Sequence, residues 1–91
     1  MLDFTSNVML NDKVVSTMVD GEIVMMDADS GSYYALNSVG TFIWELVKER
    51  RKVGDIAIEV ARAFDVVKEK SDQELVQFLE KLMSENLVIM A

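Results

Sequence analysis

The chain has 91 residues, of which 51% are hydrophobic, and it carries nine Lys and Arg against sixteen Asp and Glu, a net charge of −7. This length allows one small domain with one core, and the hydrophobic content is too high for a disordered chain. The sequence has no Cys and no His, which excludes thiol nucleophiles, Ser-His-Asp triads, disulfides and imidazole or thiolate metal sites. We therefore expect one domain over residues 1–91 that is not an enzyme and holds no metal or cofactor.

The N-terminal segment and the apolar runs predict a cytoplasmic protein with no membrane partner. No Lys or Arg precedes Lys13, so the segment lacks the basic region of a secretion signal. The longest apolar runs, such as residues 23–26, are far shorter than the roughly 20 residues that a membrane-spanning helix requires.

The first half of the chain has the pattern of a three-stranded antiparallel sheet. Residues 14–19 are rich in β-branched side chains and end at Asp20-Gly21, and an apolar segment follows at 22–26. Asp-Gly between two such segments indicates a hairpin with a type I′ turn. A second turn leads to a third strand at 32–36. Residues 8–10 form either a short additional strand or a cover over the sheet.

Helical periodicity begins after Asn37, which with Ser38 is a candidate N-cap. Apolar residues recur at helical spacing over residues 39–47 and again over 53–64. The basic residues between these two helices are expected to form a solvated connection, where they complement the dipole at the end of the first helix. They are Lys48, Arg50, Arg51 and Lys52.

A third helix is expected to begin at a capping box, Ser71-x-x-Glu74. Asn86 is expected to end it, because Asn accepts the left-handed conformation of a C′ residue. Residues 87–89 then leave as an apolar tail. The expected fold class is α+β, with three strands followed by three helices.

The third helix has a wider apolar surface than one core contact requires. Placed at 100° per residue, Leu75, Phe78, Leu79 and Leu82 form an ordinary core stripe. Val76 and Met83 extend the apolar arc to about 160°. This flank either packs on the sheet, lines a groove, or serves as the contact of a structural subunit that dimerises.

The third strand is an edge of the predicted sheet, and residues 32–36 contain no charge and no Pro. Natural proteins usually protect such edges with those features or with bulges. An unprotected edge beside an apolar helix flank suits the addition of an extended peptide as a further strand. Tyr33 and Tyr34 either offer rigid contact surfaces to such a peptide, or place one ring in the core and the other on the surface.

Three other functions are disfavoured. Residues 71–86 carry four acidic side chains against Lys81 alone, a net charge of −3, so a helix of this sign would be repelled by nucleic acid phosphates. The Asp27-x-Asp29-x-Gly31 segment fails as a calcium loop, because Gly31 and Ser38 stand where the loop needs acidic residues. No pair of carboxylates is placed for general acid-base catalysis.

The residues at the junction of the third strand and first helix resemble a known family. Residues 33–40 (YYALNSVG), then Ile43-Trp44 and Leu46, are similar to the Y-x-L-N-x-x-G-x-x-I-W-x-L core of PqqD-like proteins. These are recognition elements for precursor peptides of ribosomally synthesised natural products. The resemblance extends over about residues 14–89. Its later part includes Val53, Ile56-Ala57, Phe64-Asp65-Val66, Phe78-Leu79, Leu82 and Leu87-Val88.

This resemblance implies a winged helix-turn-helix-like domain that binds the leader segment of a precursor peptide and delivers it to a modifying enzyme. In the family, the leader lies along the third strand and against the third helix. Carried onto this sequence, the implied peptide-binding residues are Ser32, Tyr33, Tyr34, Ala35, Leu36, Val76, Leu79 and Met83.

Two pathways in the family fit a chain of this length. One is lasso-peptide biosynthesis, in which the recognition protein works with a separate leader peptidase. The other is pyrroloquinoline quinone biosynthesis, in which the protein presents the precursor to a radical SAM enzyme. The doubled tyrosine and the Asp29-Ser30-Gly31 turn favour the lasso-type protein.

Overall fold

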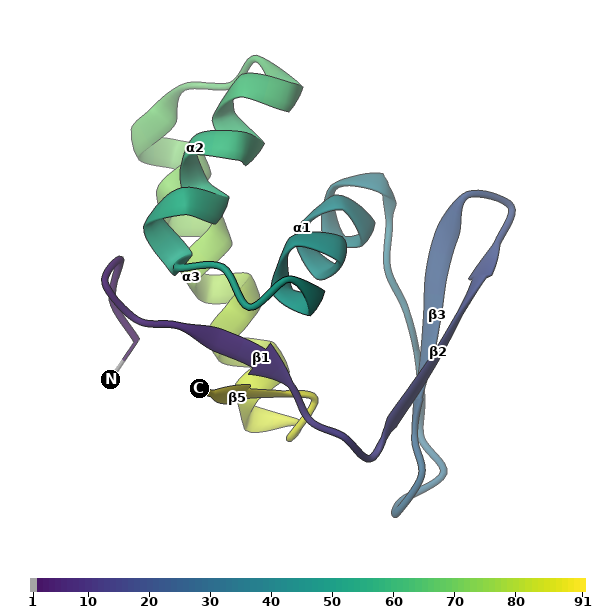
Figure 1. Cartoon of the computed structure of the whole chain (residues 1–91). Helices are drawn as coiled ribbons and strands as arrows, with labels where there is room; N and C mark the ends of the chain where they lie inside the picture. The colour runs from purple at the N-terminus through teal and green to yellow at the C-terminus, as the bar shows by residue number, and fades with distance from the viewer. Residues whose placement is uncertain (1) are drawn as a thin grey trace.

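The computed structural model describes residues 2–91, which form two small sheets and three helices (Figure 1). Strands β2, β3 and β4 make one antiparallel sheet, and β1 and β5 make the other. Helix α1 lies between the three-stranded sheet and the other two helices. The elements in chain order are β1 (Val8–Leu10), β2 (Val14–Val19), β3 (Glu22–Asp27), β4 (Tyr33–Ala35), α1 (Ser38–Lys48), α2 (Val53–Phe64), α3 (Lys68–Ser84) and β5 (Val88–Met90).

The three-stranded sheet followed by three helices confirms the predicted α+β class. Strands β2 and β3 pair from Val14↔Asp27 to the hairpin end. Asp20 and Gly21 both have positive φ, 51° and 83°, as a type I′ turn requires. The predicted Asp-Gly hairpin is therefore confirmed.

The turn between β3 and β4 is closed by its own polar groups. The Gly31 N–H donates to the Asp27 carbonyl at 2.8 Å, and the Asp29 N–H donates to the Asp27 carboxylate at 2.9 Å. Gly31 has a φ of 74°, a conformation that suits Gly. Asp29 pairs with Lys13 at 3.0 Å. The structure thus uses this acidic segment as a turn that sets where β4 begins.

The strand pairing of the two chain ends differs from the sequence-based expectation. Residues 87–89 were expected to leave α3 as an apolar tail, but β5 pairs with β1 in the register Val8↔Met90 to Leu10↔Val88. Residues 8–10 therefore form a strand in a second sheet. Local patterns carry no signal for this pairing, because its partners lie at opposite ends of the chain.

The first helix begins as predicted, and the third does not. The Asn37 side chain accepts the Gly40 N–H at 2.9 Å and caps α1. Helix α3 begins at Lys68, before the proposed capping box, and Ser71 is buried within its first turns. The left-handed residue Asp65 ends α2, with a φ of 50°. Only three residues, 65–67, separate the two helices, so α3 starts before Ser71 is reached.

The C-terminus of α3 follows the prediction. Asn86 has a φ of 60°. Its N–H donates to the Met83 carbonyl at 3.0 Å, and the Leu87 N–H donates to the Leu82 carbonyl at 2.9 Å. These two bonds form a Schellman motif with Asn86 at C′. The motif turns the chain back so that β5 can pair with β1.

The buried side chains of the sheets and helices form one cluster. Trp44 of α1 is its largest fully buried member, and Met25, Ile56 and Leu79 join it from β3, α2 and α3. Thr41 ties α1 to the sheet, because its hydroxyl accepts the Ile23 N–H at 2.9 Å. Among residues 2–91, no helix is both long and apolar enough to cross a membrane.

Candidate functional site

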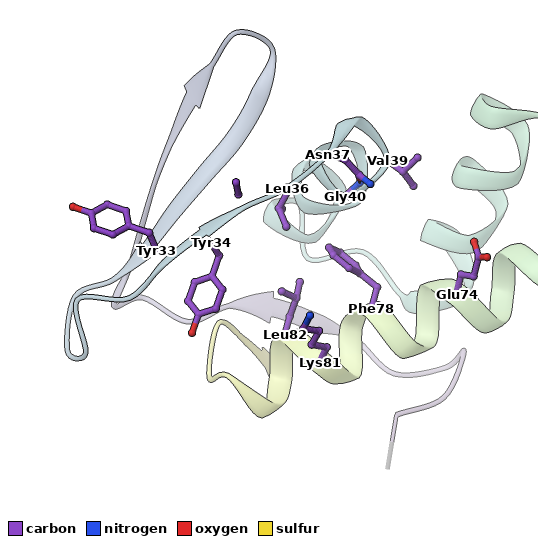
Figure 2. A pocket seen from close by; sticks show the side chains of 11 residues that line it. Tyr33, Tyr34, Leu36, Asn37, Val39, Gly40, Glu74, Phe78, Lys81 and Leu82 are labelled. Carbon is purple, nitrogen blue, oxygen red and sulfur yellow. The ribbon is translucent and has the colours of Figure 1, made fainter.

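A hollow of about 650 Å³ lies between strand β4 and helix α3, and the first turn of α1 closes one end of it (Figure 2). We call it the β4–α3 cleft. Its walls are contributed by segments far apart in the sequence. The lining residues are Tyr33, Tyr34, Ala35, Leu36, Asn37, Val39, Gly40, Glu74, Phe78, Lys81 and Leu82.

Strand β4 is an edge of the three-stranded sheet, which has the order β2-β3-β4. The Leu36 N–H donates to Ile23, and the Ser32 carbonyl accepts from Asp27. Backbone groups alternate in direction along an antiparallel strand. Those of Tyr33 and Ala35 therefore point away from β3. Within residues 2–91 they have no backbone partner, so they offer a hydrogen-bonding edge beside the cleft.

Side chains alternate along β4 as well, and this decides the roles of the two tyrosines. Tyr34 and Leu36 face the helices, where Leu36 is buried and Tyr34 is half-buried against the core. Tyr33 is 73% exposed and its ring points away from the cleft (Figure 2). Tyr33 thus lies on the surface, whereas Tyr34 is half-buried and packs against the core.

The apolar floor of the cleft is formed where β4, α1 and α3 meet. A Cβ added at Gly40 would lie 3.2 Å from the Leu36 Cβ and 3.3 Å from the Phe78 Cζ. These separations are tighter than most side-chain contacts, so Gly40 lets α1 approach both side chains. Phe78 is half-buried and Leu82 is buried. The floor therefore offers apolar surface that a ligand side chain can cover.

A hydrogen bond closes the cleft at the C-terminal end of α3. The Tyr34 hydroxyl donates to the Glu85 carboxylate at 2.8 Å. This bond, together with burial and the negative charge of Glu85, raises the pKa of Tyr34. It holds the ring across the gap between sheet and helix. Because Tyr34 lies near Glu85 and Leu36 lies near Phe78, β4 and α3 run in opposite directions across the cleft.

The structure brings the strand residues predicted for the site to the cleft. Tyr33, Tyr34, Ala35 and Leu36 line it, and Ser32 lies immediately before β4 begins. Whether they bind a peptide stays a prediction.

The three helix residues predicted for the site do not line the cleft. Leu79 is fully buried in the core, and Met83 is half-buried against it. Val76 lines a separate hollow that it shares with Phe4. A helical wheel gives the angle between residues but not which flank turns toward β4. The other flank does so here, with Glu74, Phe78 and Lys81.

The sequence contained a signal for Phe78 but not for the charged residues. Phe78 stands at the edge of the apolar stripe, a position that helical spacing alone does not distinguish from the ordinary core. Glu74 and Lys81 lie seven residues apart, which is nearly two helical turns and places them on one face. Their role at the cleft depends on the position of β4, which no local pattern reveals.

Comparison with known proteins identifies the family. Residues 22–88 match the family model described as coenzyme PQQ synthesis protein D (PqqD). A comparison with curated protein sequences finds no match.

Two solved structures share the fold. "TbiB1 in complex with the TbiA(beta) leader peptide" is 29% identical, with a TM-score of 0.84 over 88% of this chain and 93% of that chain. "Lasso peptide synthetase B1 complexed with the leader peptide" is 17% identical, with a TM-score of 0.82 over 90% of this chain and 96% of that chain. The family model covers most of the chain, and these neighbours have the same arrangement of strands and helices. The chain therefore belongs to the PqqD family.

Proposed function

We propose that the β4–α3 cleft binds the leader segment of a ribosomally synthesised precursor peptide by strand addition. In this proposal the chain performs no chemistry on the peptide. It delivers the bound precursor to a separate leader peptidase in a lasso-type pathway.

The observation that carries the proposal is the free edge of β4 above an apolar floor. The outward N–H and C=O groups of Tyr33 and Ala35 supply a register for an added strand. Inward side chains of that strand would then reach Phe78 and Leu82. Backbone bonds give such sites affinity, and pockets for alternate side chains give them specificity.

Membership of the PqqD family and the two structural neighbours support this choice of ligand. Both neighbours are described as complexes with a leader peptide, and the second is described as lasso peptide synthetase B1. The extent of the match, 88% of this chain and 93% of the first neighbour, supports the same mode of binding.

The family description supports an alternative pathway in which the same cleft would act. Because the matching model is that of a coenzyme PQQ synthesis protein, the alternative is a chaperone that presents its precursor to a radical SAM enzyme. A role of another class, a structural subunit that dimerises, would instead cover the apolar surface with a second copy.

Leader binding is tested by titrating the leader of the precursor encoded beside this gene and following backbone amide signals by NMR. We expect saturable binding, with the largest changes at Tyr33, Ala35 and Phe78. Ala35→Pro removes an N–H that points away from β3, at a position where an edge strand tolerates Pro. It should weaken binding about threefold to tenfold without unfolding the sheet.

Tyr34→Pro is the matched control, because it removes an N–H on the side that faces β3 and should disrupt the sheet itself. Failure of every neighbouring leader to bind would contradict the proposal, and a stable dimer in light scattering would favour the structural role. Delivery is tested by adding the chain to the peptidase or the radical SAM enzyme of the same gene cluster. The enzyme whose turnover of the precursor rises identifies the pathway.

A further inference from the structure

We propose that the β4–α3 cleft recognises the order of charged residues along its peptide ligand, and this inference rests on the proposed function. The ligand is an extended peptide with a basic residue, an apolar residue two positions later, and an acidic residue two positions after that. Glu74, Phe78 and Lys81 of α3 receive these three side chains in turn.

Two charged side chains lie at different positions along helix α3, on the wall of the cleft. Glu74 and Lys81 both line the cleft and are exposed, with the half-buried Phe78 between them. Neither Glu74 nor Lys81 forms a salt bridge within residues 2–91. Each is therefore available to a charge that a ligand brings into the cleft.

The neighbouring charges do not reverse this arrangement. Glu85, one turn beyond Lys81, does not line the cleft, and its carboxylate accepts the Tyr34 hydroxyl. Lys70, one turn before Glu74, is exposed and also lies outside the lining. Within the cleft the wall presents a negative charge, an aromatic ring and a positive charge.

The direction of an added strand follows from the sheet. All pairs in the β2-β3-β4 sheet are antiparallel, and antiparallel pairing is slightly more stable per residue than parallel pairing. A peptide antiparallel to β4 passes Leu36 before it passes Tyr34. Leu36 lies near Phe78, and Tyr34 lies near Glu85. The peptide therefore meets the Glu74 end of the wall first and the Lys81 end later.

The spacing of the ligand residues follows from the geometry of helix and strand. Seven residues separate Glu74 from Lys81, which is about 10 Å along a helix. Inward-facing residues of a strand repeat every ~7 Å, so two of them four positions apart span ~13 Å. Flexible Glu and Lys side chains bridge the difference. The inward residue between them then lies over Phe78 and Leu36.

The test compares two sets of synthetic nonapeptides of identical composition on an array. One set has Lys four positions before Glu, the other has Glu four positions before Lys, and both vary the apolar residue midway. We expect the wild-type chain to bind the best basic-first peptides about fivefold to twentyfold more tightly than their order-swapped partners. The double variant Glu74→Lys/Lys81→Glu should reverse this preference.

The matched control is Glu80→Lys/Lys70→Glu, which makes the same two charge changes at exposed residues of α3 outside the lining. It should keep the wild-type preference. Equal binding of both sets, an acidic-first preference, or a preference that the cleft variant fails to reverse would overturn the inference.

The leader of the neighbouring precursor gene is measured in parallel, so that the two proposals fail separately. If that leader binds while no charge-ordered nonapeptide does, the charge-order inference is wrong and the proposed function stands. If neither the leader nor any peptide binds, the proposed function itself is wrong.

Discussion

The two flanks of helix α3 have similar apolar character but different surroundings. One flank, with Phe78, faces the open cleft beneath β4. The other flank, with Val76, faces a hollow that it shares with Phe4 of the N-terminal segment. The difference shows that an apolar arc indicates a buried or binding surface, while the tertiary neighbour decides which of the two it is.

The N-terminal segment is held over the second flank by backbone bonds to α2. The Phe4 carbonyl accepts the Gly54 N–H, and the Ser6 carbonyl accepts the Val53 N–H, both at 2.9 Å. Helix α2 has no side-chain cap, so these carbonyls satisfy donors at its first turn. The Val76 flank is thus bordered by the N-terminal segment, whereas the Phe78 flank is bordered by the edge strand β4.

A charge placed on each flank in turn distinguishes the two flanks by their effect on leader binding. Phe78→Glu should weaken leader binding about thirtyfold, because an aromatic side chain at the centre of an interface can be a hot spot worth about 2 kcal/mol. Val76→Glu and Met83→Glu should change it by less than about threefold. Binding is measured by calorimetry, and folding is checked by the fluorescence of Trp44, the single tryptophan.

Phe78→Ala is a second variant in case Phe78→Glu does not fold, because it removes the ring without burying a charge. Its leader affinity should also fall, while that of Val76→Ala should not. If Val76→Glu weakens the leader more than Phe78→Glu does, the open flank has been assigned to the wrong side of the helix.

Much of the fold follows from local patterns, whereas the site depends on long-range packing. Asp20-Gly21 and Asn86 set their turns through their own backbone preferences, so the hairpin and the end of α3 were predictable. The pairing of β1 with β5 was not, because it joins residues some 80 positions apart. The strand half of the cleft was predictable from the edge of β4. The helix half required knowing which flank of α3 turns toward β4.

The two helical glycines allow a matched test of the flanks, and Gly54 has the larger expected effect. Gly→Ala in a helix ordinarily stabilises a protein by about 1 kcal/mol. At Gly54 the new Cβ would lie 2.9 Å from the Phe4 carbonyl oxygen, so the N-terminal segment must move. Gly54→Ala should therefore lower the melting temperature by several degrees, about 1 kcal/mol of stability. Leader affinity should be unchanged, and a raised melting temperature would contradict the contact.

Gly40→Ala should affect leader binding rather than stability, and the change in free energy should be smaller than for Gly54→Ala. Its Cβ would press on Leu36 and Phe78 at 3.2 and 3.3 Å, and these side chains must shift by a few tenths of an ångström. We expect leader affinity to fall about threefold while the melting temperature changes little. An unchanged affinity together with a large loss of stability would place Gly40 in the core rather than at the floor of the cleft.

The hydrogen bond between Tyr34 and Glu85 lies on the cleft flank of α3, and it predicts a shifted titration of the Tyr34 hydroxyl. The bond raises the pKa of Tyr34 above its ordinary value of 10.0, so its stabilisation is present below about pH 10 and is lost as the pH rises through the folded-state pKa. Tyr33→Phe leaves Tyr34 as the single tyrosine, because the chain has two. Its ultraviolet titration should then move to lower pH in Glu85→Gln. An unmoved titration would mean that the bond is absent in solution.

The smallest expected effect concerns the whole surface rather than one flank. The net charge of −7 should speed association with basic leader residues, and salt should screen this attraction. Raising the salt from about 0.05 M to about 0.5 M should slow association about threefold. A leader with its Lys and Arg replaced by Gln should lose that dependence. Salt should change dissociation less, because the backbone and apolar contacts inside the cleft are not screened. The contrary result is that salt accelerates dissociation more than it slows association. That result would assign the electrostatic part of binding to Glu74 and Lys81, which line the cleft, and not to the diffuse negative surface.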